Sequence, residues 1–254
     1  MVHTYTKPPA GETQFALGAP YFRQLWRCPN CLHMMNCHAF DLSNLYDGSY
    51  ALATYTDLAG IRGKFGTIEA LPPDQSDNYQ RCGYINRWWQ QHRDPINGSL
   101  LDVGSGIGVF PYRMKEQYGW TVTTVDADPL FVAHAKELGL EAIQADWVNV
   151  PPVPQGFDLV TMVHIIEHVE NPIAFLSRAK LFLSLTGAVY VEVPSVEAFK
   201  DGPGREEFHV PHEHVFSSAS LSMVARRAGF VVQEIQQGRS CSGKYDLRCF
   251  LAVA

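Results

Sequence analysis

The stretch LLDVGSGIGVF, residues 100–110, joins an apolar run to a glycine-rich turn. Glycine has no Cβ, so glycines at alternate positions let the backbone turn tightly and leave room for a ligand beside the main chain. The dinucleotide fingerprint G-x-G-x-x-G would place its third glycine at position 109, where this chain has Val109. The stretch therefore predicts a buried strand that ends at a nucleotide-like cofactor other than a dinucleotide.

Strand-like and helix-like patterns alternate around this turn over residues 76–254, as is typical of an α/β sheet with crossover helices. Apolar residues at helical spacing predict helices at residues 78–92, 111–119, 129–139, 171–187 and 217–230. Apolar runs predict seven strands, of which the last two, within 230–237 and 246–254, are expected to pair antiparallel. Residues 1–75 show little periodicity and are expected to form a small N-terminal segment.

Acidic residues follow the expected strands. Asp126 ends the second strand, 24 residues after Asp102, close to the offset at which an acid receives the ribose hydroxyls of a nucleotide. An ionised carboxylate can accept both hydroxyl protons. Asp146 ends the third strand and precedes Trp147, which would pair an acceptor with a flat apolar face suited to adenine. Alternatively, these acids cap helices, the glycines only turn the chain, and Trp147 belongs to the core.

The ordered segments LLDVGSGIGVF, VDADP, QADW and FDLVTMVHIIEHVENP resemble those of class I S-adenosylmethionine-dependent methyltransferases. The resemblance covers residues 80–254 and implies a Rossmann-like seven-stranded α/β sheet, with helices on both faces and an antiparallel last strand. It also implies S-adenosylmethionine as the cofactor. The cofactor-binding residues implied are Asp102, Gly104, Ser105, Gly106, Gly108, Asp126, Ala127, Asp146, Trp147 and His164.

Two histidine-bearing segments supply candidates for a base that removes a proton from the methyl acceptor. His168 lies in EHVENP, just after the fourth strand, where a cofactor role and a catalytic role are equally open. The stretch HEHVFSS, residues 212–218, resembles a segment of deoxysugar C-methyltransferases in which histidine and glutamate act as acid and base. That resemblance implies catalytic roles for Glu213 and His214, with His214 the favoured base. Pro211 stands where those enzymes have tyrosine, which disfavours sugar-carbon chemistry.

A cysteine cluster, RCPNCLHMMNCH, begins at residue 27. Cys28 and Cys31 form one C-x-x-C knuckle with Cys37 nearby, whereas a zinc site usually takes four ligands from two knuckles. The same deoxysugar enzymes carry an N-terminal zinc module, so the cluster predicts either a zinc site at these three cysteines or a zinc-ribbon-like module that packs without metal. Nearby aromatic residues and the helix at 78–89 either form a lid over the acceptor or fasten the segment; the aromatics are Tyr46, Tyr50 and Tyr55.

Charge and hydropathy limit the partners. The 20 Lys and Arg against 26 Asp and Glu give a net charge of −6, which argues against nucleic-acid and anionic-membrane surfaces. The sequence has neither a membrane-spanning run nor a signal-peptide pattern, and its scattered cysteines do not resemble a disulfide framework, so we expect a cytoplasmic protein.

The predicted function is O-methylation of a small hydroxylated molecule, a sugar nucleotide or glycan unit. The alternatives are C-methylation of a deoxysugar, a protein or RNA target, a nicotinamide oxidoreductase, and a cofactor-binding module without activity. The sequence leaves the acceptor, the methylated atom and the oligomeric state open.

Overall fold

The computed structural model describes residues 1–13, 20–40, 42, 50–93, 98–153 and 156–254, which fall into two compact units. Unit 1 contains Met1–Leu45, Val163–Arg178 and Val191–Ala254, and unit 2 contains Tyr46–Met162 and Ala179–Tyr190. Each unit combines segments that are far apart in the sequence, whereas the predicted boundary at residue 75 divides the chain into two continuous parts. That boundary stays a prediction.

Unit 2 holds the glycine-rich turn. Its helices are α1 (Tyr50–Tyr55), α2 (Leu58–Glu69), α3 (Asp77–His92), α4 (Val109–Tyr118) and α5 (Pro129–Glu137), with the 3-10 turns η2 (Trp147–Asn149) and most of η4 (Arg178–Phe182). Its strands are β4 (Ser99–Val103), β5 (Thr121–Asp126), β6 (Glu141–Gln144), β7 (Phe157–Val163) and the first part of β8 (Leu183–Pro194).

Unit 1 holds the histidine-bearing segments. Its strands are β1 (His3–Tyr5), β2 (Arg23–Arg27), β3 (Met34–His38), β9 (His214–Val215), β10 (Phe230–Arg239) and β11 (Tyr245–Val253). Its helices are α6 (Pro172–Ser177) and α7 (Ser218–Arg227), with the 3-10 turns η3 (Ile166–His168), η5 (Val196–Asp201) and η6 (Glu206–Phe208). No helix among the described residues is both long and apolar enough to span a bilayer.

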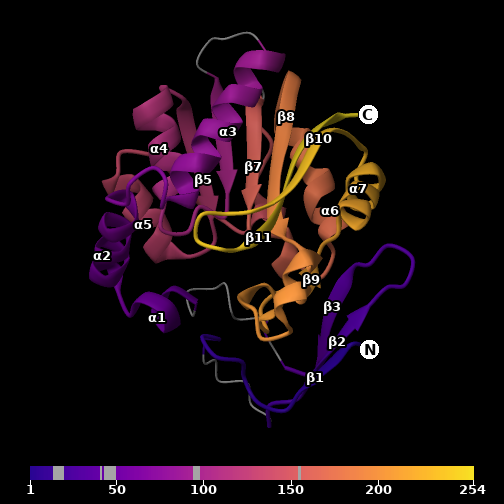
Figure 1. Cartoon of the computed structure of the whole chain (residues 1–254). Helices are drawn as coiled ribbons and strands as arrows, with labels where there is room; N and C mark the ends of the chain where they lie inside the picture. The colour runs from indigo at the N-terminus through magenta and orange to yellow at the C-terminus, as the bar shows by residue number, and fades with distance from the viewer. Residues whose placement is uncertain (14–19, 41, 43–49, 94–97, 154–155) are drawn as a thin grey trace. The chain divides into compact units, whose positions relative to one another are not determined.

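Within the described residues, seven strands form one sheet in the order β10-β11-β8-β7-β4-β5-β6 (Figure 1). β4 pairs in parallel with β5 and β7, and β10 pairs antiparallel with β11. The chain runs from β4 to β5 and β6 on one side and returns to β7 on the other. Right-handed crossovers therefore place the connecting helices on opposite faces, with a topological switch point between β4 and β7. The predicted Rossmann-like sheet is confirmed.

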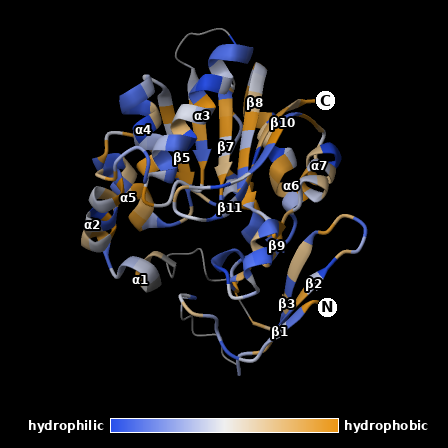
Figure 2. Cartoon of the chain, in the orientation of Figure 1, coloured by the Kyte–Doolittle hydropathy of each residue, from blue (hydrophilic) through white to orange (hydrophobic). Residues whose placement is uncertain are grey.

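Local sequence accounts for these elements. Figure 2 shows β7 and β8 coloured mainly as hydrophobic; β7 is buried along its middle, and β8 is buried from Gly187 to its end. Such continuous apolar runs are typical of strands covered on both faces. Ser76 begins α3 by accepting a hydrogen bond from the Tyr79 N–H at 3.2 Å, and Asp128 begins α5 in the same way, directly before Pro129. The helix predicted at residues 78–92 is confirmed as α3.

The single helix predicted at residues 171–187 is wrong. Helix α6 ends at Ser177, a 3-10 turn follows to Phe182, and β8 begins at Leu183. A Cβ on Gly187 would lie 2.8 Å from the Phe157 carbonyl oxygen, so the chain there runs directly against the neighbouring backbone, as a strand does. Leucines at 181, 183 and 185 also have the two-residue period of a strand, which the helical interpretation overlooked.

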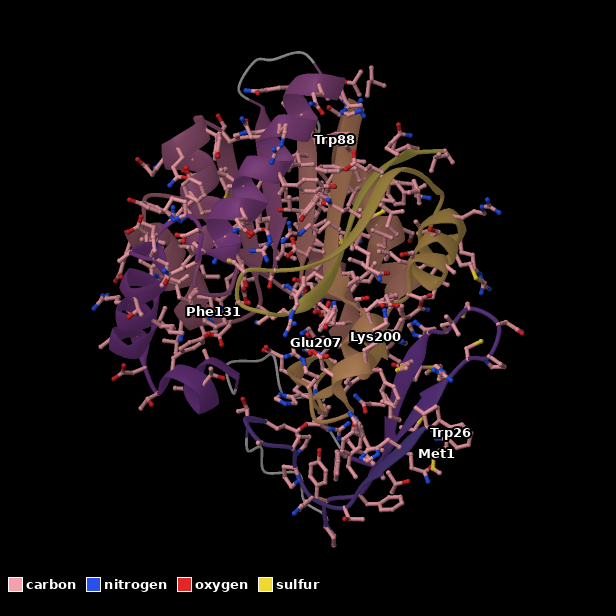
Figure 3. All side chains as sticks on the ribbon, in the orientation of Figure 1. Met1, Trp26, Trp88, Phe131, Lys200 and Glu207 are labelled. Carbon is pink, nitrogen blue, oxygen red and sulfur yellow. The ribbon has the colours of Figure 1, made fainter. Side chains whose placement is uncertain are left out.

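Unit 1 also contains a small sheet in the order β1-β2-β3-β9, in which each neighbouring pair is antiparallel. Its strands have two to five residues, too few to show a clear periodicity in the sequence. Its buried side chains form one apolar cluster, made of Tyr5, Leu25, Met34, Ala198, Phe208 and Val215. Trp26 points away from this cluster on β2, with 47% of its surface exposed (Figure 3).

Arg23 is the polar centre of the small sheet. Its side chain is fully buried and its Nη2 lies 3.2 Å from Glu12 Oε2. The guanidinium also donates to Asn36 Oδ1 and to the Tyr21 hydroxyl, and it lies 3.6 Å from the centre of the Tyr5 ring. Because its donors and its charge are matched by these groups, the buried cation is compensated.

Replacing Arg23 should therefore destabilise the protein strongly. Arg23→Ala leaves Glu12 as a buried carboxylate without its main cation, which costs about 3–5 kcal/mol of the free energy of unfolding. Urea denaturation measures this value, and Arg27→Ala, at an exposed position of the same strand, is the matched control. Equal stability of the two variants would contradict the role assigned to Arg23.

Candidate active site

The glycine-rich turn between β4 and α4 leaves space beside its backbone. Gly104 has a φ of 72° and Gly106 a φ of 51°, in the left-handed region that other residues rarely adopt. A Cβ on Gly106 would meet no atom within 4 Å, so this part of the turn borders open space. Ser105 Oγ is buried and has no hydrogen-bond partner among the described residues. The turn thus offers an approachable backbone and a free hydroxyl to a ligand.

Asp126, at the end of β5, is held next to this turn. Its Oδ2 accepts the Gly106 N–H at 3.0 Å and its Oδ1 accepts the Asp128 N–H at 3.0 Å. A carboxylate has about four acceptor positions, so two remain for ligand hydroxyls. Burial raises the pKa of Asp126 to about 6, although the backbone N–H groups of Asp128 and Gly106 act to lower it. The carboxylate is therefore oriented and largely ionised near neutral pH.

Asp102, at the end of β4, is more deeply buried. The Thr161 hydroxyl of β7 donates to Asp102 Oδ1 at 2.6 Å. Burial raises the pKa of Asp102 to about 7, with Thr161 and the Arg81 charge opposing the rise. Asp102 and Thr161 thus connect the two strands that flank the switch point.

This raised pKa predicts a pH-dependent stability. The folded-state pKa of Asp102 exceeds its ordinary value of 3.8, so its contribution to stability is fully present below that value and is lost as the pH rises through about 7. Between pH 5 and 8, wild-type protein should lose about 2–3 kcal/mol of unfolding free energy relative to Asp102→Asn. Urea denaturation across this range measures the difference. A difference that does not change with pH would show that Asp102 has an ordinary pKa.

The remaining cofactor candidates of unit 2 differ in exposure. Ala127 is half-buried and follows Asp126, and Gly108 begins α4. Asp146 is exposed, and its Oδ1 accepts the Val148 N–H at 3.2 Å, capping η2. Trp147 is buried, with its ring centre 4.5 Å from that of Phe182. Its indole is thus packed in the core, in line with the alternative interpretation, and a role towards adenine stays a prediction.

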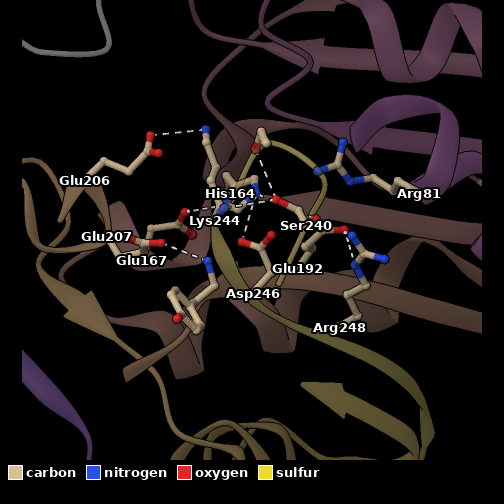
Figure 4. Close-up of polar contacts among 12 residues, drawn as sticks. Arg81, His164, Glu167, Glu192, Glu206, Glu207, Ser240, Lys244, Asp246 and Arg248 are labelled. Carbon is tan, nitrogen blue, oxygen red and sulfur yellow. Dashed lines mark hydrogen bonds and ion pairs between the residues drawn. The ribbon is translucent and has the colours of Figure 1, made fainter. Parts of the chain in front are cut away.

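His164 is the centre of a polar cluster in unit 1, which we call the His164 cluster: His164, Glu167, Glu192 and Asp246. His164 Nδ1 lies 3.3 Å from Glu167 Oε1, and its Nε2 lies 3.8 Å from Glu192 Oε1 and 3.7 Å from Asp246 Oδ1. Figure 4 shows the side chains of Glu192 and Asp246 pointing toward His164. His164 also has a φ of 53°, a strained conformation that is often found at functional sites.

The charges in the His164 cluster depend on one another. Burial alone would lower the pKa of His164, but Glu167, Asp246 and Glu192 raise it above its ordinary value. Burial alone would raise the pKa of Glu167, but His164 and His168 lower it. The carboxylates therefore favour the cationic form of His164.

Glu192 and Asp246 were not predicted from the sequence as site residues. Glu192 is fully buried in β8, and Arg248 Nε lies 3.5 Å from its Oε2. The signal was present, because Glu192 is the only charged residue in the apolar run AVYVEVPS. A charged residue in such a run is rarely buried unless it is paired. Asp246 has no comparable signal, since it lies at the start of its strand.

The catalytic candidates lie in two places within unit 1. His168 lies near the His164 cluster, with Nε2 3.8 Å from Glu167 Oε1. His214 lies on β9, and its Nδ1 is 3.1 Å from His33 Nε2. Burial lowers the pKa of His214. The backbone carbonyl of Glu213 accepts the Asn36 N–H, and burial together with Glu170 raises the pKa of its side chain. This placement favours His168 over His214 as the residue nearest the buried acids.

The three cysteines proposed as zinc ligands do not lie together in the structure. Cys28 and Cys31 lie in the turn between β2 and β3, whereas Cys37 is exposed and pairs with Gln24 further along the hairpin. Cys37 lies three residues along β3 from Met34, the residue next to the turn, which corresponds to about 10 Å. Among the described residues, no group of three potential metal ligands includes a cysteine. The structure therefore does not support zinc binding by these three residues together.

The expected lid can be located only in part. Tyr46 and the side chain of Tyr50 lie outside the described residues. The Tyr55 ring packs edge-on against Phe131, with ring centres 5.9 Å apart. Trp89 of α3 similarly packs against Trp120, with centres 5.0 Å apart. The Tyr55 contact supports the alternative in which the aromatic residues fasten the N-terminal segment, whereas the Trp89 contact lies within the predicted 76–254 domain.

Comparison with known proteins identifies relatives. The family described as a methyltransferase domain matches residues 75–235. The ubiquinone biosynthesis O-methyltransferase of Klebsiella pneumoniae is 36% identical over 140 residues, which are 51% of this chain and 52% of that protein. The tRNA U34 carboxymethyltransferase of Idiomarina loihiensis is 25% identical over 190 residues, 65% of this chain and 58% of that protein. The chain thus spans about half the length of the curated relatives that it matches.

The fold also has solved counterparts. The 1,6-didemethyltoxoflavin-N1-methyltransferase of Burkholderia thailandensis, with bound 1,6-didemethyltoxoflavin and S-adenosylhomocysteine, superposes with a TM-score of 0.57 at 17% identity. The alignment covers 90% of this chain and 98% of that one. At this identity the likeness shows a shared fold.

Proposed function

The chain belongs to the methyltransferase domain family, and from that premise we propose that it uses S-adenosylmethionine to methylate a hydroxyl group of a small molecule. The cofactor would supply an electrophilic methyl group on a sulfonium. The residues of this chain would bind the cofactor, orient the acceptor and remove the hydroxyl proton. Transfer of this kind is an in-line displacement, in which positioning supplies much of the rate.

The observation that carries the proposal is the arrangement of Asp126 beside the open space at Gly106. Two backbone N–H groups fix the carboxylate, and two acceptor positions remain for the ribose hydroxyls. The free Ser105 hydroxyl can donate to a carboxylate such as that of the methionine part. The remaining cofactor residues implied by the sequence are part of the same proposal.

For the acceptor, we favour a hydroxylated ring of the quinone type. The sequence predicted a sugar-nucleotide or glycan acceptor, whereas several of the relatives are named for ubiquinone biosynthesis. A phenolic hydroxyl also needs less help from a base than an alcohol does, because its pKa is near 10. The net charge of −6 makes RNA a second candidate at most.

The proton of the hydroxyl would pass to His168 when no metal ion is bound at its Nε2. The Pro211 carbonyl oxygen lies 2.8 Å from His168 Nδ1 and can only accept a hydrogen bond, so in the neutral ring the proton is on Nδ1 and Nε2 has the lone pair. A positioned base of this kind contributes roughly 10²–10⁴-fold to the rate. The roles proposed from the sequence for Glu213 and His214 can be compared with this one by mutation.

The test is to incubate the full chain with S-adenosylmethionine and either a soluble catechol or a sugar nucleotide, and to identify products by mass spectrometry. The proposal expects a methyl ether of the catechol together with S-adenosylhomocysteine. Methylation of the sugar nucleotide alone, or at carbon, would contradict the acceptor. Cofactor binding without methylation of these or any other hydroxylated acceptor would favour a binding module.

A further inference from the structure

We propose that Glu167, His168 and His212 form a binding site for one divalent transition-metal ion. Each residue offers one ligand atom, and these atoms all lie within 4.8 Å of one another in unit 1. Ligand atoms bound to one ion at ~2.1 Å lie about 3–3.5 Å apart, so small side-chain movements would close the site. Glu167 and His168 come from η3, and His212 comes from the loop that precedes β9.

The histidine hydrogen bonds orient both rings for metal binding. His168 Nδ1 lies 2.8 Å from the Pro211 carbonyl oxygen, and His212 Nδ1 lies 3.0 Å from the Glu207 carbonyl oxygen. A carbonyl oxygen can only accept, so in the neutral form of each ring Nδ1 carries the proton and Nε2 has the lone pair. Metal-binding histidines are held in this way by a second hydrogen bond that fixes the tautomer.

The carboxylate of Glu167 completes the argument. Its side chain is fully buried, and neither oxygen has a hydrogen-bond partner among the described residues. His168 Nε2, which has the lone pair, lies 3.8 Å from Glu167 Oε1. When the His168 ring is neutral, its Nε2 lone pair faces the Glu167 carboxylate in a buried site, an arrangement that a cation between them would stabilise. His164 Nδ1 lies 3.3 Å from the same oxygen.

The ligand set indicates the class of metal. Two imidazoles and one carboxylate with open positions suit Fe²⁺, Mn²⁺, Co²⁺ or Zn²⁺, whereas Mg²⁺ and Ca²⁺ prefer sites made of oxygen alone. The open positions would be available to water or to an acceptor oxygen. The inference does not depend on the proposed methyl transfer, because metal binding can be measured without an acceptor or a cofactor.

The experiment measures metal bound to the full chain after chelation and dialysis against Co²⁺ or Zn²⁺. Elemental analysis should find about one ion per chain, and Co²⁺ should give visible d–d bands without the charge-transfer band of a thiolate ligand. Glu167→Gln and His212→Ala should each weaken binding at least 10-fold. Thermal melting of each variant would show whether it is folded. If one of them is not folded, His168→Gln is tested in its place.

Two controls separate this site from other ligands. His209→Ala removes a histidine of the same loop that is outside the group and should bind metal as wild type does. The double variant Cys28→Ser/Cys31→Ser should also bind normally. Absence of binding by the wild-type chain, or loss of binding in the cysteine variant with retention in His212→Ala, would overturn the proposal.

Discussion

Asp126→Ala should weaken the binding of S-adenosylhomocysteine by about 100-fold or more. The carboxylate is oriented by the Gly106 and Asp128 N–H groups, and its remaining acceptor positions would each bind one ribose hydroxyl. Hydrogen bonds to a charged group contribute about 1.5–3 kcal/mol each, and 1.4 kcal/mol corresponds to a factor of ten in affinity. Isothermal titration calorimetry measures the change directly.

Asp126→Asn separates lost binding from a disturbed turn. Its amide oxygen can still accept one backbone N–H, so the turn should persist, yet the charge is lost and binding should still weaken at least 10-fold. Glu141→Ala, on the neighbouring strand β6 and exposed, removes the same charge elsewhere and should bind normally. Wild-type affinity in both Asp126 variants would refute the assignment of this residue to the ribose.

His168→Ala should lower turnover by about 100-fold or more while leaving S-adenosylhomocysteine affinity unchanged. His168 is the histidine next to the buried Glu167 carboxylate, and its Nε2 has the lone pair needed to accept a proton or to bind a cation. Loss of a group that acts only during the reaction lowers kcat without changing cofactor binding. Formation of S-adenosylhomocysteine with the methylated catechol as product gives the rate.

His214→Ala is the informative comparison, because the sequence favours His214 as the base. In the structure its ring contacts His33, and burial lowers its pKa. We expect this variant to lose stability and to keep turnover within about 10-fold of wild type once folded. A loss in His214→Ala that exceeds the loss in His168→Ala would return the catalytic role to the sequence-based candidate.

The sheet could be predicted because its signals are local. Glycines at 104 and 106 and the alternation of apolar runs with helical periods identify the parallel strands and most of the helices. The segment at 171–187 was misjudged because Phe175, Ala179 and Phe182 keep helical spacing up to the point where the strand begins. A small zinc-ribbon-like N-terminal segment was predicted, but not its individual strands, because they are short and one of them pairs with β9, about 180 residues later in the sequence.

The site could be predicted only where it follows strand ends. Asp102 and Asp126 sit at the ends of β4 and β5, where the sequence placed them. The His164 cluster brings together residues from β8, β11 and the turn after β7, and no spacing in the sequence links them. The proximity of His212 to Glu167 could not be predicted either. It depends on how two segments that are distant in the sequence pack in the fold, which sequence spacing does not show.

The central claim is that this chain binds S-adenosylmethionine, and calorimetric titration of the purified protein with S-adenosylhomocysteine and, separately, with NAD tests it most directly. The open space at Gly106, the oriented Asp126 carboxylate and the absence of a glycine at position 109 predict micromolar binding of the former and none of the latter. Binding of NAD, or of neither compound, would contradict the account of the glycine-rich turn.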